Sequence, residues 1–112
     1  RAYLRRHGDL AVARVITIGT PHRGTRLASF GLGGNVRQMR LDSDWLKALA
    51  AGETQADRQM FTIILSHHDN IVAPQSIQVL PDAKAIALDG IGHISMASDA
   101  RVTELVADNL KF

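Results

Sequence analysis

Three short apolar segments, each followed by a stretch of polar and turn-forming residues, constrain the fold of this chain most. Val12–Ile18 is rich in β-branched residues, Met60–Ser66 is a second apolar segment, and Lys84–Leu88 is a shorter third one. Such segments, separated by helical patterns, predict parallel strands joined through crossovers. The predicted fold class is α/β: a three-stranded parallel sheet with flanking helices. Its first strand leaves the upstream edge unpaired unless another strand lies beside it.

A helix is predicted at the start of the chain. Residues 1–8 carry basic side chains towards their end, which favour the negative pole of a helix dipole. Gly8 suits the left-handed position just beyond a helix. No helix-start pattern precedes these residues, so we expect the chain to begin inside a helix, as a piece of a longer domain would.

Two further helices are predicted from capping residues and apolar spacing. Ser43 can cap a helix over 44–51 that Gly52 ends, and Ser98 or Asp99 can cap a last helix near the C-terminus. The expected apolar positions of these two helices are Trp45, Leu46 and Leu49 in the first, and Val102, Leu105, Val106 and Leu110 in the second. Residues 22–42 are expected to be mixed loop and short helix.

Composition excludes several classes of protein. Hydrophobic residues make up 46% of the chain and charged residues 21%, which is typical of a folded globular protein rather than a disordered one. The chain has no cysteine, so disulfides and thiolate metal sites are excluded. No apolar run approaches the roughly 20 residues that a membrane-spanning helix needs, and we expect no transmembrane segment.

Charge is distributed unevenly along the chain. Residues 1–40 contain eight arginines against Asp9 alone, and the remainder contains five basic and ten acidic residues. A basic half can indicate a nucleic-acid partner. Here the arginines form no dense block, and aromatic residues, which stack on bases, make up only 4% of the chain. We therefore interpret the arginines as a solvated surface and expect no nucleic-acid partner.

Two candidate catalytic residues follow the second and third predicted strands. Asp69 lies just after Met60–Ser66, and His93 lies just after Lys84–Leu88, within Gly90-Ile-Gly-His93. Because reactive groups collect at the carboxyl ends of parallel strands, these two side chains can meet at neighbouring strand ends. An aspartate that accepts a hydrogen bond from a histidine ring fixes its tautomer and stabilises the imidazolium. The pair therefore predicts a general base and the acid that orients it.

Other residues in this region are also candidates for a chemical role. Asp89 is a competing acid, but it precedes the glycine turn that leads to His93. His67 and His68 lie beside Asp69, and this cluster suggests a metal-binding site, since histidine and carboxylate both bind zinc. Adjacent histidines on a strand would point to opposite faces, and no third ligand has suitable spacing. We therefore expect no metal site and no cofactor.

The remaining candidates are interpreted as structural. His22 and Arg23 could contact a substrate, but their loop is expected mainly to support the site. The six serines include no Gly-x-Ser-x-Gly elbow, so none is expected to be a nucleophile. The glycines of Gly31–Gly34 follow no strand and lack the lysine of a phosphate-binding loop, so they are predicted to form an ordinary loop.

Four segments, in order, resemble the α/β-hydrolase lipases and esterases, especially the bacterial triacylglycerol lipases. Val15–Thr25, which contains Gly-Thr-Pro-His-Arg-Gly-Thr, is similar to the sixth strand of that family and the loop after it. Gln38–Leu49 is similar to the segment that follows and leads towards the lid region. Ser66–Pro74 resembles the acid loop of the family, and Gly90–Ser95 its histidine loop. The resemblance covers nearly the whole chain.

By this resemblance, residues 1–112 are the C-terminal portion of a single α/β-hydrolase domain, and Arg1–Gly8 is the end of the helix after the nucleophile elbow. The resemblance implies a serine hydrolase of carboxylic esters, of lipid type, in which Asp69 and His93 are the acid and base of a Ser-His-Asp triad. The serine and the oxyanion-hole donors would belong to the N-terminal half, which is a partner of this piece.

Two alternatives remain open. One is another acyl-transfer chemistry on the same fold, as in a phospholipase, thioesterase or acyltransferase. The other is a non-catalytic, truncated hydrolase-like module that acts only in binding or interaction. The sequence leaves the compartment undetermined, although a secreted or membrane-peripheral lipase would fit the resemblance.

Overall fold

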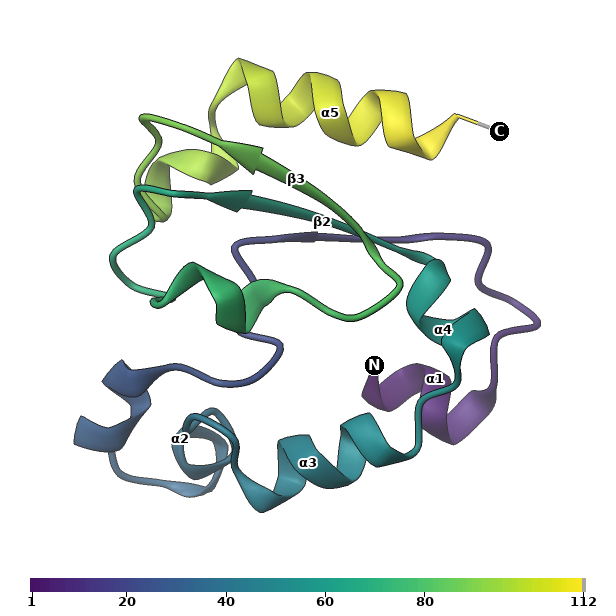
Figure 1. The fold of residues 1–112 in the computed structure, drawn as a ribbon, viewed down its shortest axis with the longest axis vertical. Helices are drawn as coiled ribbons and strands as arrows, with labels where there is room; N and C mark the ends of the chain where they lie inside the picture. Colours follow the sequence, from purple (N-terminus) through teal and green to yellow (C-terminus); the bar gives the residue numbers. More distant parts are fainter. Residues whose placement is uncertain (112) are drawn as a thin grey trace.

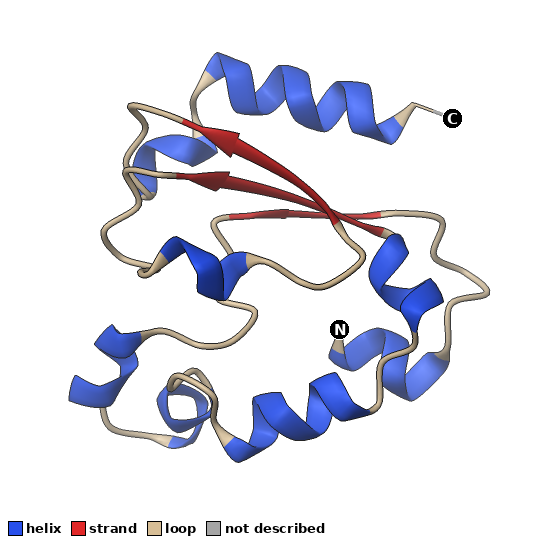
Figure 2. Cartoon of the chain, viewed as in Figure 1, coloured by secondary structure: helices blue, strands red, loops and turns tan. Residues whose placement is uncertain are grey.

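The computed structural model describes residues 1–111 and contains a parallel three-stranded sheet between two layers of helix (Figures 1 and 2). The sheet order follows the sequence, β1-β2-β3. The elements in chain order are α1 (Ala2–His7), β1 (Val15–Ile18), the 3₁₀ helix η1 (Arg26–Phe30), α2 (Gly34–Gln38), α3 (Asp44–Ala51), α4 (Gln55–Gln59), β2 (Phe61–Ser66), the 3₁₀ helix η2 (Gln75–Gln78), β3 (Lys84–Leu88), the 3₁₀ helix η3 (Ile94–Ala97) and α5 (Ala100–Leu110). The predicted fold class, a three-stranded parallel sheet with flanking helices, is confirmed.

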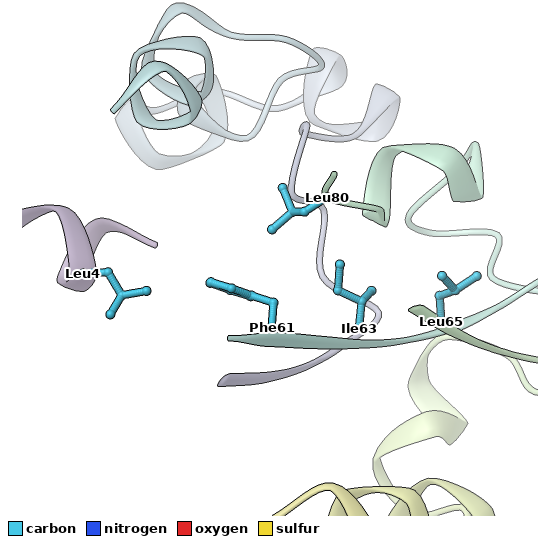
Figure 3. Packing of buried hydrophobic residues seen from close by; sticks show 5 residues of the cluster. All are labelled: Leu4, Phe61, Ile63, Leu65 and Leu80. Atoms are coloured by element: carbon cyan, nitrogen blue, oxygen red, sulfur yellow. The ribbon is translucent and has the colours of Figure 1, made fainter. Parts of the chain in front are cut away.

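The central strand β2 is covered on both faces because its side chains alternate. Phe61, Ile63 and Leu65 pack with Leu4 of α1 and with Leu80, as Figure 3 shows. Ile64 points to the opposite face. There the last helix, α5, and its preceding loop complete a second cluster, of Ile64, Ile91, Met96 and Val102. The strand therefore joins two small cores, which makes it the most buried element of the sheet.

The connections of the sheet share one face. α1, the helices between β1 and β2, and η2 between β2 and β3 lie on one side of the sheet, and α5 lies on the other (Figure 1). Both crossovers advance the sheet in the same direction, from β1 through β2 to β3. Because β1 pairs only with β2 among residues 1–111, its other edge carries no ladder hydrogen bonds.

Several boundaries differ from the prediction. The first strand begins at Val15 rather than at Val12, because Val12 N bonds to Asp9 O in a turn. The helix α4 was not predicted, although Thr54 and Asp57 form a reciprocal capping box at its start. The predicted caps of the other helices are confirmed: Ser43 begins α3 and Asp99 begins α5.

The apolar faces of these helices are narrower than predicted. Leu46 and Leu49 of α3 and Val102 of α5 are buried as expected. Trp45 is 44% exposed and Leu110 is 53% exposed, because each lies at the border of its helix face where the described chain supplies no covering element.

Ile63 provides a test of the core. Its side chain is fully buried in the cluster on the α1 face. We expect Ile63→Val to lower the free energy of unfolding by about 1 kcal/mol, because one buried methyl group is lost. Urea titration followed by circular dichroism measures this change. Leu10→Ala is the control: Leu10 is wholly exposed, so a loss of similar size there would contradict the assignment of the core.

Candidate functional site

The site forms where β2 and β3 end side by side. The two strands are parallel, and Ser66 at the end of β2 stands opposite Leu88 at the end of β3. Asp69 and His93 follow in the next two loops. Parallel pairing in this register therefore brings residues 24 positions apart in sequence into one place, as the sequence predicted.

Asp69 and His93 are in direct contact. Nδ1 of His93 lies 2.8 Å from Oδ2 of Asp69. The aspartate side chain is fully buried and the histidine side chain is 28% exposed. Because a carboxylate can only accept, Nδ1 donates, and Nε2 of the neutral ring is left as an acceptor. Within residues 1–111, Nε2 has no hydrogen-bond partner.

The acid is held in its ionised form by backbone amides. Burial by itself raises the pKa of Asp69, but hydrogen bonds outweigh it and the net pKa is lowered. Oδ1 accepts from the Val72 amide at 2.8 Å and from the Ile71 amide at 3.0 Å, and His93 donates to Oδ2. A buried aspartate that stays charged at neutral pH can orient and stabilise an imidazolium.

The histidine loop is tied back to the end of β2. The Ser66 hydroxyl donates to Ile91 O at 2.5 Å, and the Gly90 amide donates to Nδ1 of His68 at 2.8 Å. Gly90 has a φ of 72°, so the turn uses backbone freedom that other residues lack. These contacts hold the residues just before His93 against the end of β2.

Gly19 lies close to both Asp69 and His93. It follows β1 with a φ of 56°, and its amide donates to Ile64 O. A Cβ built on Gly19 would lie 3.1 Å from both Cε1 and Nδ1 of His93 and 3.4 Å from Oδ2 of Asp69. All three strand ends therefore contribute to the site, with β1 supplying a residue that leaves room for the ring.

None of the alternative candidates from the sequence takes part in the contact between Asp69 and His93. Asp89 is exposed, and its carbonyl oxygen accepts from Arg101. His67 and His68 lie in the turn after β2 rather than on a strand, and both are exposed. Residues 1–111 contain no cluster of three or more histidine, cysteine or acidic side chains placed to bind a metal. No serine hydroxyl in that range hydrogen-bonds to His93.

His22 and Arg23 make contacts outside the Asp69–His93 pair. His22 is buried, its Nε2 lies 3.1 Å from the Thr17 hydroxyl, and its ring meets Phe61 edge to face. Burial, aided by the charge of Arg1, lowers the pKa of His22 to about 4. Arg23 forms an exposed ion pair with Asp42. Neither residue contacts Asp69 or His93.

Two glutamines of η2 were missed by sequence reasoning. Gln78 is fully buried and its amide nitrogen lies 3.3 Å from Oδ2 of Asp69 and 3.0 Å from Val72 O. Gln75 donates to the backbone oxygens of Asp69 and His67. The spacing of two glutamines in a 3₁₀ helix carries no recognisable motif, so only the folded chain reveals these contacts.

Comparison with known proteins adds no identification. No protein-family model matches the chain, and no curated protein matches it. None of the helices within residues 1–111 combines the length and the apolar composition that crossing a bilayer requires.

The low pKa of His22 predicts loss of stability in acid. The unfolded chain binds a proton at His22 below about pH 6.5, whereas the folded chain resists it down to about pH 4, so stability falls as the pH drops through this window. From pH 7.5 to pH 5 the loss is about 2 kcal/mol. We expect His22→Gln to remove this part of the loss, as measured by urea unfolding at both pH values; equal losses in both proteins would contradict the assignment.

A substitution at Gly19 is expected to displace the His93 ring. Gly19→Ala places a methyl group against the His93 ring and forces a non-glycine residue into a positive φ. We expect displacement of the ring from Asp69, seen as a changed position of the His93 ring resonances in NMR spectra. Gly8→Ala is the control, because Gly8 also has a positive φ but nothing within 4 Å of an added Cβ. A His93 spectrum that responds equally to both changes would argue against contact with Gly19.

Proposed function

We propose that this chain supplies the acid and base of a serine hydrolase that acts on carboxylic esters, with Asp69 and His93 in those roles. The observation that carries the proposal is the 2.8 Å contact between a buried carboxylate and Nδ1 of a partly exposed histidine at the carboxyl edge of a parallel sheet. The resemblance of the loops to bacterial lipases and esterases supports the reaction class and favours lipid esters.

In the proposed reaction, His93 acts through Nε2. It takes the proton of a serine hydroxyl as that oxygen attacks the ester carbonyl, and then gives the proton to the leaving alcohol. Asp69 keeps the ring oriented and stabilises the imidazolium in each step. A water molecule, activated by the same nitrogen, then releases the acid from the acyl-enzyme. These steps need no cofactor.

The serine has to come from outside these 112 residues, since they contain no Gly-x-Ser-x-Gly elbow. The topology indicates where it would enter. α1 lies on the same face as both crossovers, so a strand that leads into α1 with the same handedness would lie along the open edge of β1. The carboxyl end of that strand would then lie next to Gly19, beneath the ring of His93.

The surface beside β1 suits such a neighbour. An apolar groove of about 290 Å³ lies between β1 and α3, with Val15, Met39, Trp45 and Phe61 among its lining residues. Apolar side chains of an added strand would fill the groove and cover the exposed part of Trp45. We therefore propose that residues 1–112 are one part of a single α/β-hydrolase domain.

Ester hydrolysis tests the proposal. We expect the 112-residue chain alone to be inactive, and a chain with an upstream Gly-x-Ser-x-Gly segment to hydrolyse p-nitrophenyl esters and to react with a fluorophosphonate. In that longer chain, Asp69→Asn should lower kcat by roughly 10³- to 10⁴-fold and His93→Ala by at least as much, because the base is lost or held in the wrong tautomer.

Asp89→Asn is the matched control, because Asp89 is the nearby acid that lies outside the site; its activity should stay close to that of the unchanged protein. Fluorophosphonate labelling of the 112-residue chain would show that the nucleophile lies within it. An inactive longer chain would instead favour a non-catalytic binding module.

A further inference from the structure

Gln78 makes an unusual set of contacts for a core residue. Its side chain is fully buried, and its amide nitrogen donates to Oδ2 of Asp69 and to Val72 O. Its own oxygen, Oε1, is buried and has no hydrogen-bond partner among residues 1–111. Both neighbours of the nitrogen are pure acceptors, so rotating the amide by 180° would set oxygen against oxygen. The orientation is therefore fixed by its partners.

This arrangement is costly for folding. A buried carbonyl oxygen without a partner loses its hydration and gains nothing in return, whereas an apolar side chain of similar shape avoids the loss. Buried polar groups of this kind need a specific reason. Among residues 1–111, the Gln78 side chain hydrogen-bonds only to Val72 O and to the Asp69 carboxylate, so the reason lies at one of these two places.

The hydrogen bond to the Asp69 carboxylate explains why Gln78 is buried there. Both backbone donors, Ile71 N and Val72 N, bond to Oδ1. Oδ2 receives hydrogen bonds only from His93 and Gln78 within residues 1–111. His93 is partly exposed on a loop, so Gln78 is the only fully buried donor to Oδ2 among residues 1–111.

We propose that Gln78 is a positioning residue that holds Oδ2 of Asp69 towards Nδ1 of His93 at the expense of folding stability. By fixing Oδ2, it keeps the neutral ring in the tautomer with the proton on Nδ1, which leaves Nε2 as the base. The catalytic meaning of this role rests on the proposed hydrolase function. The effect on the ring does not, and it can be measured in the 112-residue chain.

The test compares Gln78→Met with Gln75→Met. Both remove an amide from η2, but Gln75 bonds only to backbone oxygens of the acid loop. Nitrogen-15 NMR of the His93 ring, at a pH where the imidazole is neutral, reports the tautomer. We expect Gln78→Met to shift the ring towards a mixture of tautomers, with a denaturation midpoint equal to or above that of the unchanged chain. Gln75→Met should leave the tautomer unchanged.

Two results would overturn the proposal. One is an unchanged His93 spectrum in Gln78→Met, or the same change in Gln75→Met, since the carboxylate contact would then be irrelevant. The other is a clear fall in the denaturation midpoint in both Gln78→Met and Gln78→Leu, which would make Gln78 a stabilising core residue. An expected tautomer shift together with an inactive longer chain would support the positioning role and refute only the hydrolase function.

Discussion

The buried carboxylate of Asp69 is the group around which the carboxyl edge of the sheet is organised. A charge with no exposure to solvent requires compensation, and four donors supply it: two backbone amides, one glutamine and one histidine. The donors come from the acid loop, from η2 and from the loop after β3. Satisfying one carboxylate therefore joins three segments that are separate in sequence.

Parallel pairing makes this arrangement possible. Because β2 and β3 run in the same direction and end in register, the loops that follow them start from adjacent points. Ser66 adds a second link by bonding to Ile91 O across the same edge. Gly19, at the end of β1, lets the ring lie against backbone. Hydrogen bonds join the carboxyl ends of β2 and β3, whereas β1 pairs with no other strand on its far side within residues 1–111. That open side is where the proposed nucleophile would enter.

Much of the fold was predictable because local chemistry decided it. Short apolar runs located the three strands, and Ser43 and Asp99 located the starts of α3 and α5. α4 was missed although its capping box is visible in the sequence, because its five residues carry too few apolar positions for a helical period. Trp45, predicted on the apolar face of α3, is 44% exposed, since helical spacing defines a face but not the partner that covers it.

The sequence by itself determined the residue types of the candidate pair and their positions after two strands, since order along the chain and strand direction follow from local pattern. Only the tertiary structure decided that the pair is in contact, that Gly19 lies beneath the ring, and that Gln78 bonds to the acid. Such contacts depend on register, loop path and burial, which are set by packing between segments far apart in sequence.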